Sequence, residues 1–415
     1  MDLSKILRYQ IVFSLFALCC LTANVYAEEL GPLETDGKLS LAEVLQKAFE
    51  RNPRQQVLQA EHLTVESRKL HADSALPGAP AVSVLHQNDV GGNGHLSEWE
   101  AAVELPIWLP GQRAAREAVA RVARGGIEAN SAGLKLYVAG QLRDAVWDLS
   151  MNANAVDLAK QRWQTAESLQ HDVERRYQAG ELARTDVLLA RNEALQAQSL
   201  LVRAQAELKH AEHRYWMLTG LKQRPATATE SLSDRTDLDE RHPLLAENAQ
   251  RVALTEEERN LTRVQKRENP QVVVNARHER GAFDSEYNDS VGLAVRIPLD
   301  SDVRSAPMLA GAEMAVAQAM SEREQLMLTL RTALHEAEHN LEVTRAELAV
   351  FEEQDRLTQD NLRLAKKAFD LGESDLVSLL RVQMLAYEAE RAVGSRKIQL
   401  QWDIAKYNQA VGVLP

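Results

Sequence analysis

The sequence predicts a mainly helical chain with a small β part, built from two copies of one structural unit. The segment 177–190 (YQAGELARTDVLLA) aligns without a gap with 369–382 (FDLGESDLVSLLRV), which indicates an internal duplication. Aromatic residues make up 5% and charged residues 26% of the chain, a composition typical of long helices. Two regions change from a helical to an alternating apolar–polar period, which adds two β-hairpins to the helices.

The N-terminus has the pattern of a cleaved secretory signal. A basic start and an apolar run over 11–21 precede a small-residue cleavage site at Ala27, so residues 1–27 are expected to be removed. Both cysteines, Cys19 and Cys20, lie inside this leader. The mature chain would then have no thiol. Lipidation of either cysteine is disfavoured because Leu18 and Cys19 precede them and the cleavage site at Ala27 fits better.

The first repeat is expected over 28–220. Ser40 can cap a helix that begins at Leu41, with Glu43 placed for the reciprocal capping-box bond. The elements that follow are a β-hairpin, a long helix and a return helix, over 81–107, 111–178 and 184–220. A continuous helix of this length measures roughly 100 Å, so it must pack in a bundle or coiled coil.

The second repeat is expected over 241–415, after a polar connector over 221–240. It begins with a helix and repeats the order of the first unit. Its hairpin, long helix and return helix are expected over 271–299, 303–370 and 375–412.

The hairpin strands have one apolar and one polar face, as in a barrel with lipid outside and water inside. The residues expected to face lipid are Trp99, Ala101, Val103, Leu105, Val291, Leu293, Val295 and Ile297. An edge hairpin on a soluble core is the alternative. Because the smallest spanning barrels have about eight strands, four strands per chain require that two or more chains share one barrel.

Charged residues surround the turn in each copy of the repeated segment. The candidate tip residues are Gly180, Glu181, Arg184, Asp186, Gly372, Glu373, Asp375, Ser378 and Arg381. In a multimer such charges would ring a tunnel mouth and attract cations; ordinary helix-end chemistry is the alternative reading. Arg184 aligns with Leu376 and Asp186 with Ser378, so one tip is expected to gate and the other to dock.

Two histidine patterns raise the question of a metal site. The segment 335–339 (HEAEH) matches the zinc-protease string H-E-x-x-H, but it lies midway along a predicted helix and no further ligand motif follows. His210 and His213 stand beside Lys209 and Arg214, which disfavour a cation. No catalytic, cofactor or metal site is therefore expected. The formal charge of −12 does not favour binding to nucleic acid, which is itself negatively charged.

The leader, the duplicated plan and the Tyr/Phe-x-x-Gly tips resemble the TolC-type outer-membrane efflux family. The segment 105–113 (LPIWLPGQR) is similar to one in its CzcC-like branch, which serves cobalt, zinc and cadmium exporters, with departures at Trp108, Pro110 and Gln112. The resemblance implies a homotrimer with one shared outer-membrane β-barrel and a helical tunnel in the periplasm. It also implies a periplasmic adaptor and an inner-membrane pump of the resistance-nodulation-division type, with the helix tips forming the periplasmic aperture and docking surface.

The expected function is a non-enzymatic exit duct of a tripartite efflux pump that exports divalent metal cations. A duct for drugs or for type I secretion is the alternative within the same class. A soluble periplasmic coiled-coil adaptor and a zinc metalloprotease are the alternatives from other classes.

Overall fold

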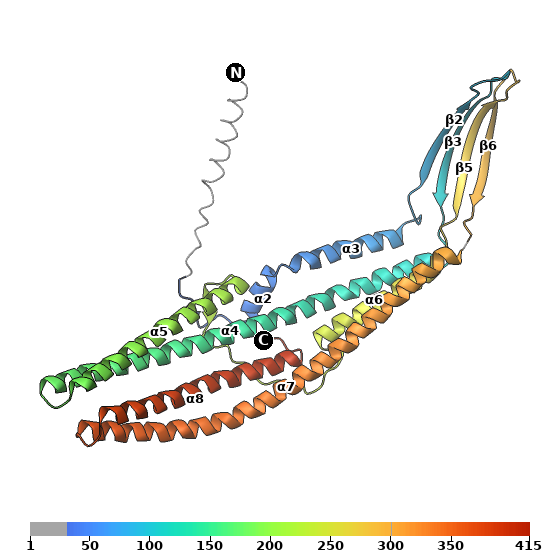
Figure 1. Ribbon diagram of the computed structural model, residues 1–415. Helices are drawn as coiled ribbons and strands as arrows, with labels where there is room; N and C mark the ends of the chain where they lie inside the picture. Colours follow the sequence, from blue (N-terminus) through green and yellow to red (C-terminus); the bar gives the residue numbers. More distant parts are fainter. Residues whose placement is uncertain (1–30, 300) are drawn as a thin grey trace, which may run out of the picture.

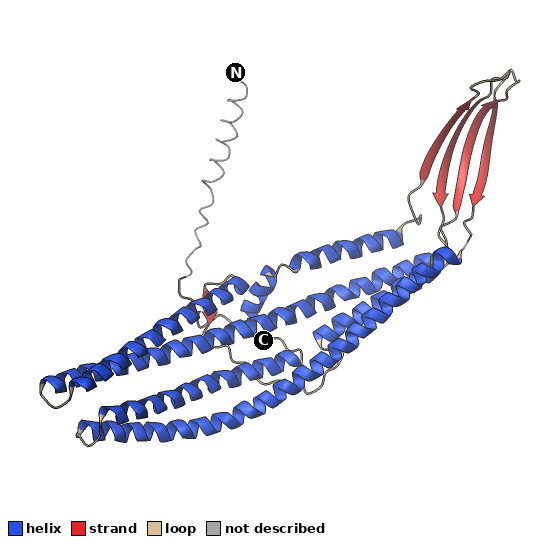
Figure 2. Ribbon diagram, viewed as in Figure 1, coloured by secondary structure: helices blue, strands red, loops and turns tan. Residues whose placement is uncertain are grey.

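The computed structural model describes residues 31–299 and 301–415, and the predicted leader lies outside them. The molecule is elongated, with a four-stranded sheet at one end and two long helical hairpins that end in tips at the other (Figure 1). Shorter helices and loops make up the rest (Figure 2). The predicted class, mainly α with a small β part, is confirmed.

The elements follow the predicted order. The first half contains β1 (Glu34–Asp36), α2 (Leu41–Arg51), α3 (Gln55–Asp73), β2 (Ala81–Asn88), β3 (Ser97–Pro106), α4 (Gln112–Gln178) and α5 (Arg184–Thr219). The second half contains β4 (Gln223–Pro225), α6 (Pro243–Val264), β5 (Gln271–Arg280), β6 (Asn288–Arg296), α7 (Asp302–Asp370) and α8 (Leu376–Ala410). The long and return helices differ from their predicted bounds by about two residues at most, within the usual scatter of helix ends.

The capping box at the start of α2 forms as predicted. The Glu43 N–H donates to Ser40 Oγ at 3.2 Å, and the Ser40 N–H donates to the Glu43 carboxylate at 2.9 Å. These bonds satisfy two donors that would otherwise lack partners at the helix start. The apolar stripe behind the cap, Val44, Leu45 and Ala48, is buried. It packs in a core cluster with residues of the middle of α4 and the end of α5, and this region is called the waist of the molecule.

The long helices form a row of four. α5 packs on α4, α4 on α8, and α8 on α7, so α5 and α7 lie at opposite ends of the row. Within each antiparallel pair the buried residues recur at alternating steps of three and four, as in α5 at Ala190, Ala194, Ala197 and Leu201. This is the spacing of a coiled-coil seam, and its small side chains let the helices approach closely.

The sheet is antiparallel in the order β2-β3-β5-β6, so its central pair joins the hairpins of the two repeats. Residues that are paired directly across strands share a face of the sheet. Ala101 pairs with Ala276 and Ala276 with Val291, and the neighbouring rows follow the same register. β2 and β6 are left as the two edges.

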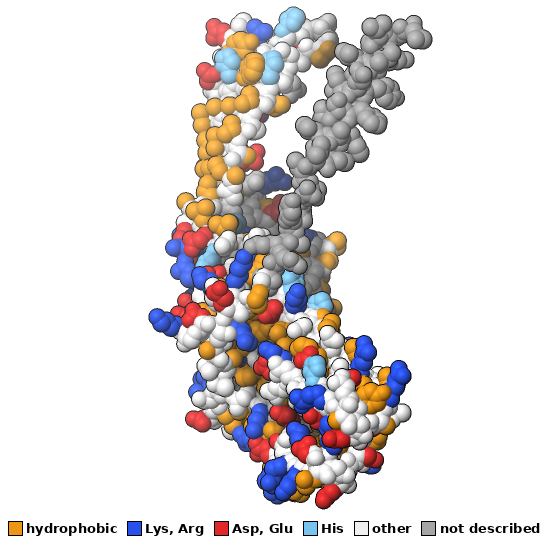
Figure 3. Space-filling view, turned by 90° about the vertical axis from the view of Figure 1, so that its left-hand side faces the viewer, with side chains coloured by type: hydrophobic (Ala, Val, Ile, Leu, Met, Phe, Trp, Pro, Cys, Tyr) orange, Lys and Arg blue, Asp and Glu red, His pale blue; other side chains and the backbone are white. Residues whose placement is uncertain are grey.

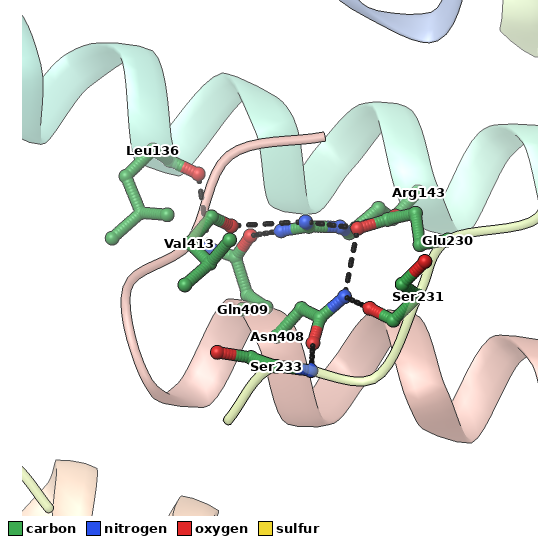
Figure 4. Close-up of polar contacts among 8 residues, drawn as sticks. All are labelled: Leu136, Arg143, Glu230, Ser231, Ser233, Asn408, Gln409 and Val413. Atoms are coloured by element: carbon green, nitrogen blue, oxygen red, sulfur yellow. Dashed lines mark hydrogen bonds and ion pairs between the residues drawn. The ribbon is translucent and has the colours of Figure 1, made fainter. Parts of the chain in front are cut away.

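The connector is more structured than the predicted polar linker over 221–240. Its first residues form β4, which pairs in parallel with β1 through Glu34 and Gln223. Farther along, Glu230 forms a buried ion pair with Arg143 of α4, with a Nε–Oε1 distance of 2.8 Å (Figure 4). The side chains of Arg143 and Glu230 are only 2% and 8% exposed.

The same ion pair holds the end of α8. Arg143 also donates to the Gln409 side chain at 2.6 Å and to the Val413 carbonyl at 2.9 Å. Asn408 donates to Glu230 at 3.1 Å and accepts from the Ser233 N–H at 2.9 Å (Figure 4). The network therefore ties the connector, α4 and the C-terminal segment together at the waist.

Candidate functional site

Each tip turns at a glycine in the left-handed region, with φ of +82° at Gly180 and +74° at Gly372. The residue after each glycine donates its N–H to a carbonyl in the last helical turn, as Glu181 does to Arg176 at 2.9 Å and Glu373 does at the same distance. This is a Schellman-type helix end. Its left-handed backbone conformation is unfavourable for residues other than glycine. The duplicated turn therefore has one backbone geometry in both copies.

Each tip has one capping carboxylate, and its position in the helix start differs between the two copies. In the first, Asp186 accepts from the Ala183 N–H at 3.1 Å; in the second, Asp375 accepts from the Ser378 N–H at 2.8 Å. Ala183 aligns with Asp375, so the carboxylate stands at the third helical position in one copy and at the N-cap in the other. The hydrogen bonds from Ser378 hold the pKa of Asp375 below its usual value. The alignment of Asp186 with Ser378 thus reflects two ways to cap the same helix start.

Arg176 joins the two tips. Its Nε donates to Glu181 at 3.1 Å within the first tip, and its Nη1 donates to the Phe369 carbonyl of the second tip at 3.3 Å. The guanidinium also lies over the Phe369 ring, 4.9 Å from its centre. Below this contact Val173, Phe369, Leu376 and Leu379 form a buried apolar cluster.

Of the predicted tip residues, Arg184, Glu373 and Arg381 are exposed and make no ion pair within the described residues. Glu181 is neutralised by Arg176, and both aspartates are used in caps. The end of the molecule therefore carries mixed charge, and the geometry does not favour a purely acidic ring.

Neither histidine pattern gathers a set of ligands. His335 and His339 lie exposed on α7, and His213 packs its ring against Trp216 at 5.6 Å. Across residues 31–299 and 301–415 no group of three or more His, Cys, Asp or Glu side chains could hold a metal ion.

At the opposite end, one face of the sheet is apolar and uncovered. Seven of the eight residues predicted to face lipid share this face by the strand register, and Ile297 follows directly after β6. All eight are exposed except Leu105, which is half-buried. Exposure reaches 81% at Val291 and 73% at Leu293, and Figure 3 shows hydrophobic side chains running along the sheet. Within the described residues, no helix carries an apolar stretch long enough to span a bilayer.

The other face of the sheet is polar. Arg277 forms ion pairs with Glu98 at 2.9 Å and Glu100 at 3.2 Å, and Asn275 donates to Glu100 at 2.8 Å. Alternation of an exposed apolar face with a hydrogen-bonded polar face suits a wall between lipid and water.

Exposed apolar residues also mark both ends of the helix row. They recur at every seventh position along α7 and at the residue that caps its end: Val343, Val350, Leu357, Leu364 and the cap Leu371, with exposures between 39% and 65%. On α5 they recur at Leu188, Leu195 and Val202, with exposures between 56% and 61%. A seven-residue apolar repeat is the pattern of a coiled-coil contact, and here nothing in the described chain covers it.

The two stripes match in position. Leu188 is as far along the chain from Gly180 as Leu364 is from Gly372, and the same relation holds for Leu195 with Leu357 and for Val202 with Val350. Because α5 starts at its tip and α7 ends at its tip, the stripes would meet antiparallel at equal heights. Sequence reasoning missed them, although the spacing of seven is readable in the sequence.

Comparisons with known proteins identify the fold. No family model and no curated protein matches the chain. A membrane protein from Pseudomonas aeruginosa superposes with a TM-score of 0.72 at 16% identity, covering 94% of each chain. The outer membrane protein VceC from Vibrio cholerae gives 0.70 at 14% identity, covering 90% of this chain and 97% of its own. The CmeC outer membrane channel of Campylobacter jejuni gives 0.67 at 13% identity, covering 90% and 85%.

Proposed function

We propose that this chain, which shares its fold with those outer-membrane channels, belongs to the TolC-type family and is the exit duct of a tripartite efflux pump. In this proposal the sheet contributes to an outer-membrane barrel and the helices form a tunnel in the periplasm. The chain acts as a passage and not as an enzyme.

The uncovered edges of the sheet and of the helix row are the observation that most supports the proposal. The sheet ends at β2 on one side and β6 on the other, and the helix row ends at α5 and α7. A spanning sheet cannot leave open edges in hydrocarbon, and the apolar stripes on α5 and α7 equally need partners. Because the two edges of each layer differ, head-to-tail contacts between copies would cover both and close a ring.

The number of copies is bounded by the barrel. Four strands per chain and a minimum of about eight strands require at least two chains. The family resemblance makes the ring a homotrimer. A trimer would place six helix tips around the periplasmic mouth, where the Gly180 and Gly372 turns would meet an adaptor protein.

Divalent metal cations are the proposed cargo, and the pump is proposed to be of the resistance-nodulation-division type. Support comes from the likeness of 105–113 to the CzcC-like branch. In the structure this segment is a corner between β3 and α4: Gln112 is buried and exchanges hydrogen bonds with Asn269 at 2.6 and 3.2 Å. The segment lies at the junction of sheet and helix, and its likeness is the only support for metal over other cargo. A duct for drugs or type I secretion is therefore the second candidate.

Deletion of the gene, with complementation by the full chain, tests this function. The proposal predicts lost tolerance to cobalt, zinc or cadmium with unchanged antibiotic sensitivity, and a heat-modifiable oligomer in outer-membrane fractions. Antibiotic sensitivity alone would favour the drug duct. Recovery in the soluble periplasm would favour the coiled-coil adaptor, and hydrolysis lost in Glu336→Gln would favour the protease.

A further inference from the structure

A cavity of about 370 Å³ lies among three helices on the sheet side of the waist. There α3 and α6 each pack along α4, one on either side of it (Figure 1). The lining comes from 61–68 of α3, 122–130 of α4 and 247–254 of α6. No lining residue belongs to the tips, the sheet or the apolar stripes, so the cavity is separate from the surfaces described above. Its volume is within the range of sites for small organic ligands.

Small residues of α4 leave the space that the cavity occupies. Ala123 and Gly126 line it, and a Cβ placed on Gly126 would meet no neighbouring heavy atom within 4 Å. Two turns farther along α4, Gly133 lets the Glu247 carboxylate lie against the helix, because a Cβ there would lie 1.9 Å from a Glu247 oxygen. Glycine is unfavourable inside a helix, and here its lack of a side chain keeps the cavity open and admits the carboxylate.

Two carboxylates of the lining have no ion pair. Within the part of the chain that the structure describes, Glu247 makes no hydrogen bond, and Glu61 accepts one only from the neutral Asn130 amide, at 2.9 Å. Burial raises the pKa of Glu247. The nearby charge of Glu61 adds to the rise, whereas the charges of Arg54 and Arg251 oppose it. A carboxylate that is half-buried without a bonded partner is stabilised by a cation that enters the cavity.

The two arginines of the lining are already paired with other carboxylates. Arg68 donates to Glu258 at 2.9 Å and so bridges α3 to α6. Arg251 pairs with Glu322 of α7 at 2.8 Å. The cavity therefore presents unpaired negative charge, and this disfavours an anionic ligand and favours a cationic one.

The rest of the wall is largely apolar. Val65, Ile127 and Leu254 contribute to it from the three helices. A metal ion would find only two carboxylates here, and the described residues contain no group of three or more side chains that could hold one. An organic cation with an apolar body would use both the charge and the apolar wall.

We propose that this cavity binds a small organic cation, an aryl or alkyl ammonium, with its charged group between Glu61 and Glu247 and its apolar body on the α4 floor. The site lies within one chain. It therefore depends neither on closure of a ring of copies nor on whether the duct exports metals or drugs, and its test is independent of the test of the proposed function.

Saturation-transfer NMR with benzyltrimethylammonium tests the site in the full chain, purified in a non-ionic detergent. This probe joins a quaternary ammonium to one phenyl ring. We expect saturable binding with a dissociation constant on the order of 1 mM, since the probe is small. Benzenesulfonate, which is similar in size and opposite in charge, should not bind.

Substitutions locate the binding. Glu61→Gln and Glu247→Gln should each weaken it about tenfold, because each removes one charge-assisted contact. Gly126→Leu should abolish it by filling the floor. The matched control is Glu66→Gln on α3: the Glu66 carboxylate lies 4.0 Å from Arg124 and is 69% exposed, so its loss should leave binding unchanged. The glutamine variants keep the shape of the side chain and test the charge even where the leucine variant folds poorly.

Three results would overturn the proposal. Equal binding of benzenesulfonate would show that the charge of the ligand does not matter. Unchanged affinity in both glutamine variants would place the binding elsewhere. Displacement of benzyltrimethylammonium by a lower concentration of Zn²⁺ would make the cavity a metal site. None of these results bears on export, so failure of the site and failure of the proposed function are distinguishable.

Discussion

Replacement of Arg143 should weaken the waist of the molecule more than replacement of any surface arginine. Arg143→Met leaves the Glu230 carboxylate 8% exposed with only Asn408 to bond it. Removal of one partner from a buried ion pair costs about 3–5 kcal/mol, because the remaining charge stays buried without compensation. The matched control is Arg251→Met: Arg251 pairs with Glu322 at 2.8 Å, but their side chains are 60% and 35% exposed. Exposed pairs contribute about 0–1 kcal/mol.

The assay measures local opening of the connector. Limited proteolysis of purified protein in detergent reports how often residues 226–241 detach, and denaturant midpoints report the loss of stability. Arg143→Met should be cut in the connector much faster than the parent chain, and Arg251→Met should not. The double variant Arg143→Met/Glu230→Met removes both charges and should recover most of the loss. Equal effects of the two single variants would refute the reasoning.

Three further outcomes follow from the described contacts. Leu357→Ala removes about three carbons from a side chain that is 54% exposed in the single chain. The free energy of association should therefore weaken by about 1.3 kcal/mol at each contact between copies. Size-exclusion chromatography should show dissociation for Leu357→Ala but not for Leu200→Ala, which lies off the stripe. Gly180→Pro or Gly372→Pro cannot adopt a φ near +80° and should abolish export without lowering membrane insertion; normal export at parent protein levels would exclude docking at the tips. Burial raises the pKa of Glu247, so its charged form costs stability as the pH rises through that value; Glu247→Gln should raise Tm near pH 8 but not near pH 4, and equal Tm changes at both would contradict this.

Local signals made most of the fold predictable. Helix starts and ends were visible because Ser40 caps its helix and glycine ends the helices at Gly180 and Gly372, and each of these acts within about five residues. The two faces of the sheet were visible because strand alternation has a period of two. The pairing of β3 with β5 across the repeats came only with the structure, since separate hairpins do not specify how they join.

Long-range contacts explain what the sequence did not show. Arg143 and Glu230 are 87 residues apart, and each looks like an ordinary surface charge in its own segment. At the tips, the structure shows a capping carboxylate at two positions, Asp186 in the first copy and Asp375 in the second. The stripe that includes Leu357 was hidden because a second, buried seam runs along the same helix and dominates the pattern.

Disulfide cross-linking between the matched stripes tests the central claim most directly. Leu195→Cys and Leu357→Cys, combined in chain without Cys19 and Cys20, should oxidise between copies because the two positions lie at equal heights on α5 and α7. The control pair, Leu200→Cys with Leu357→Cys, should not cross-link. A ladder of linked chains that ends at a closed trimer is the predicted result. Monomers alone, or a disulfide within one chain, would contradict a duct built as a ring of copies.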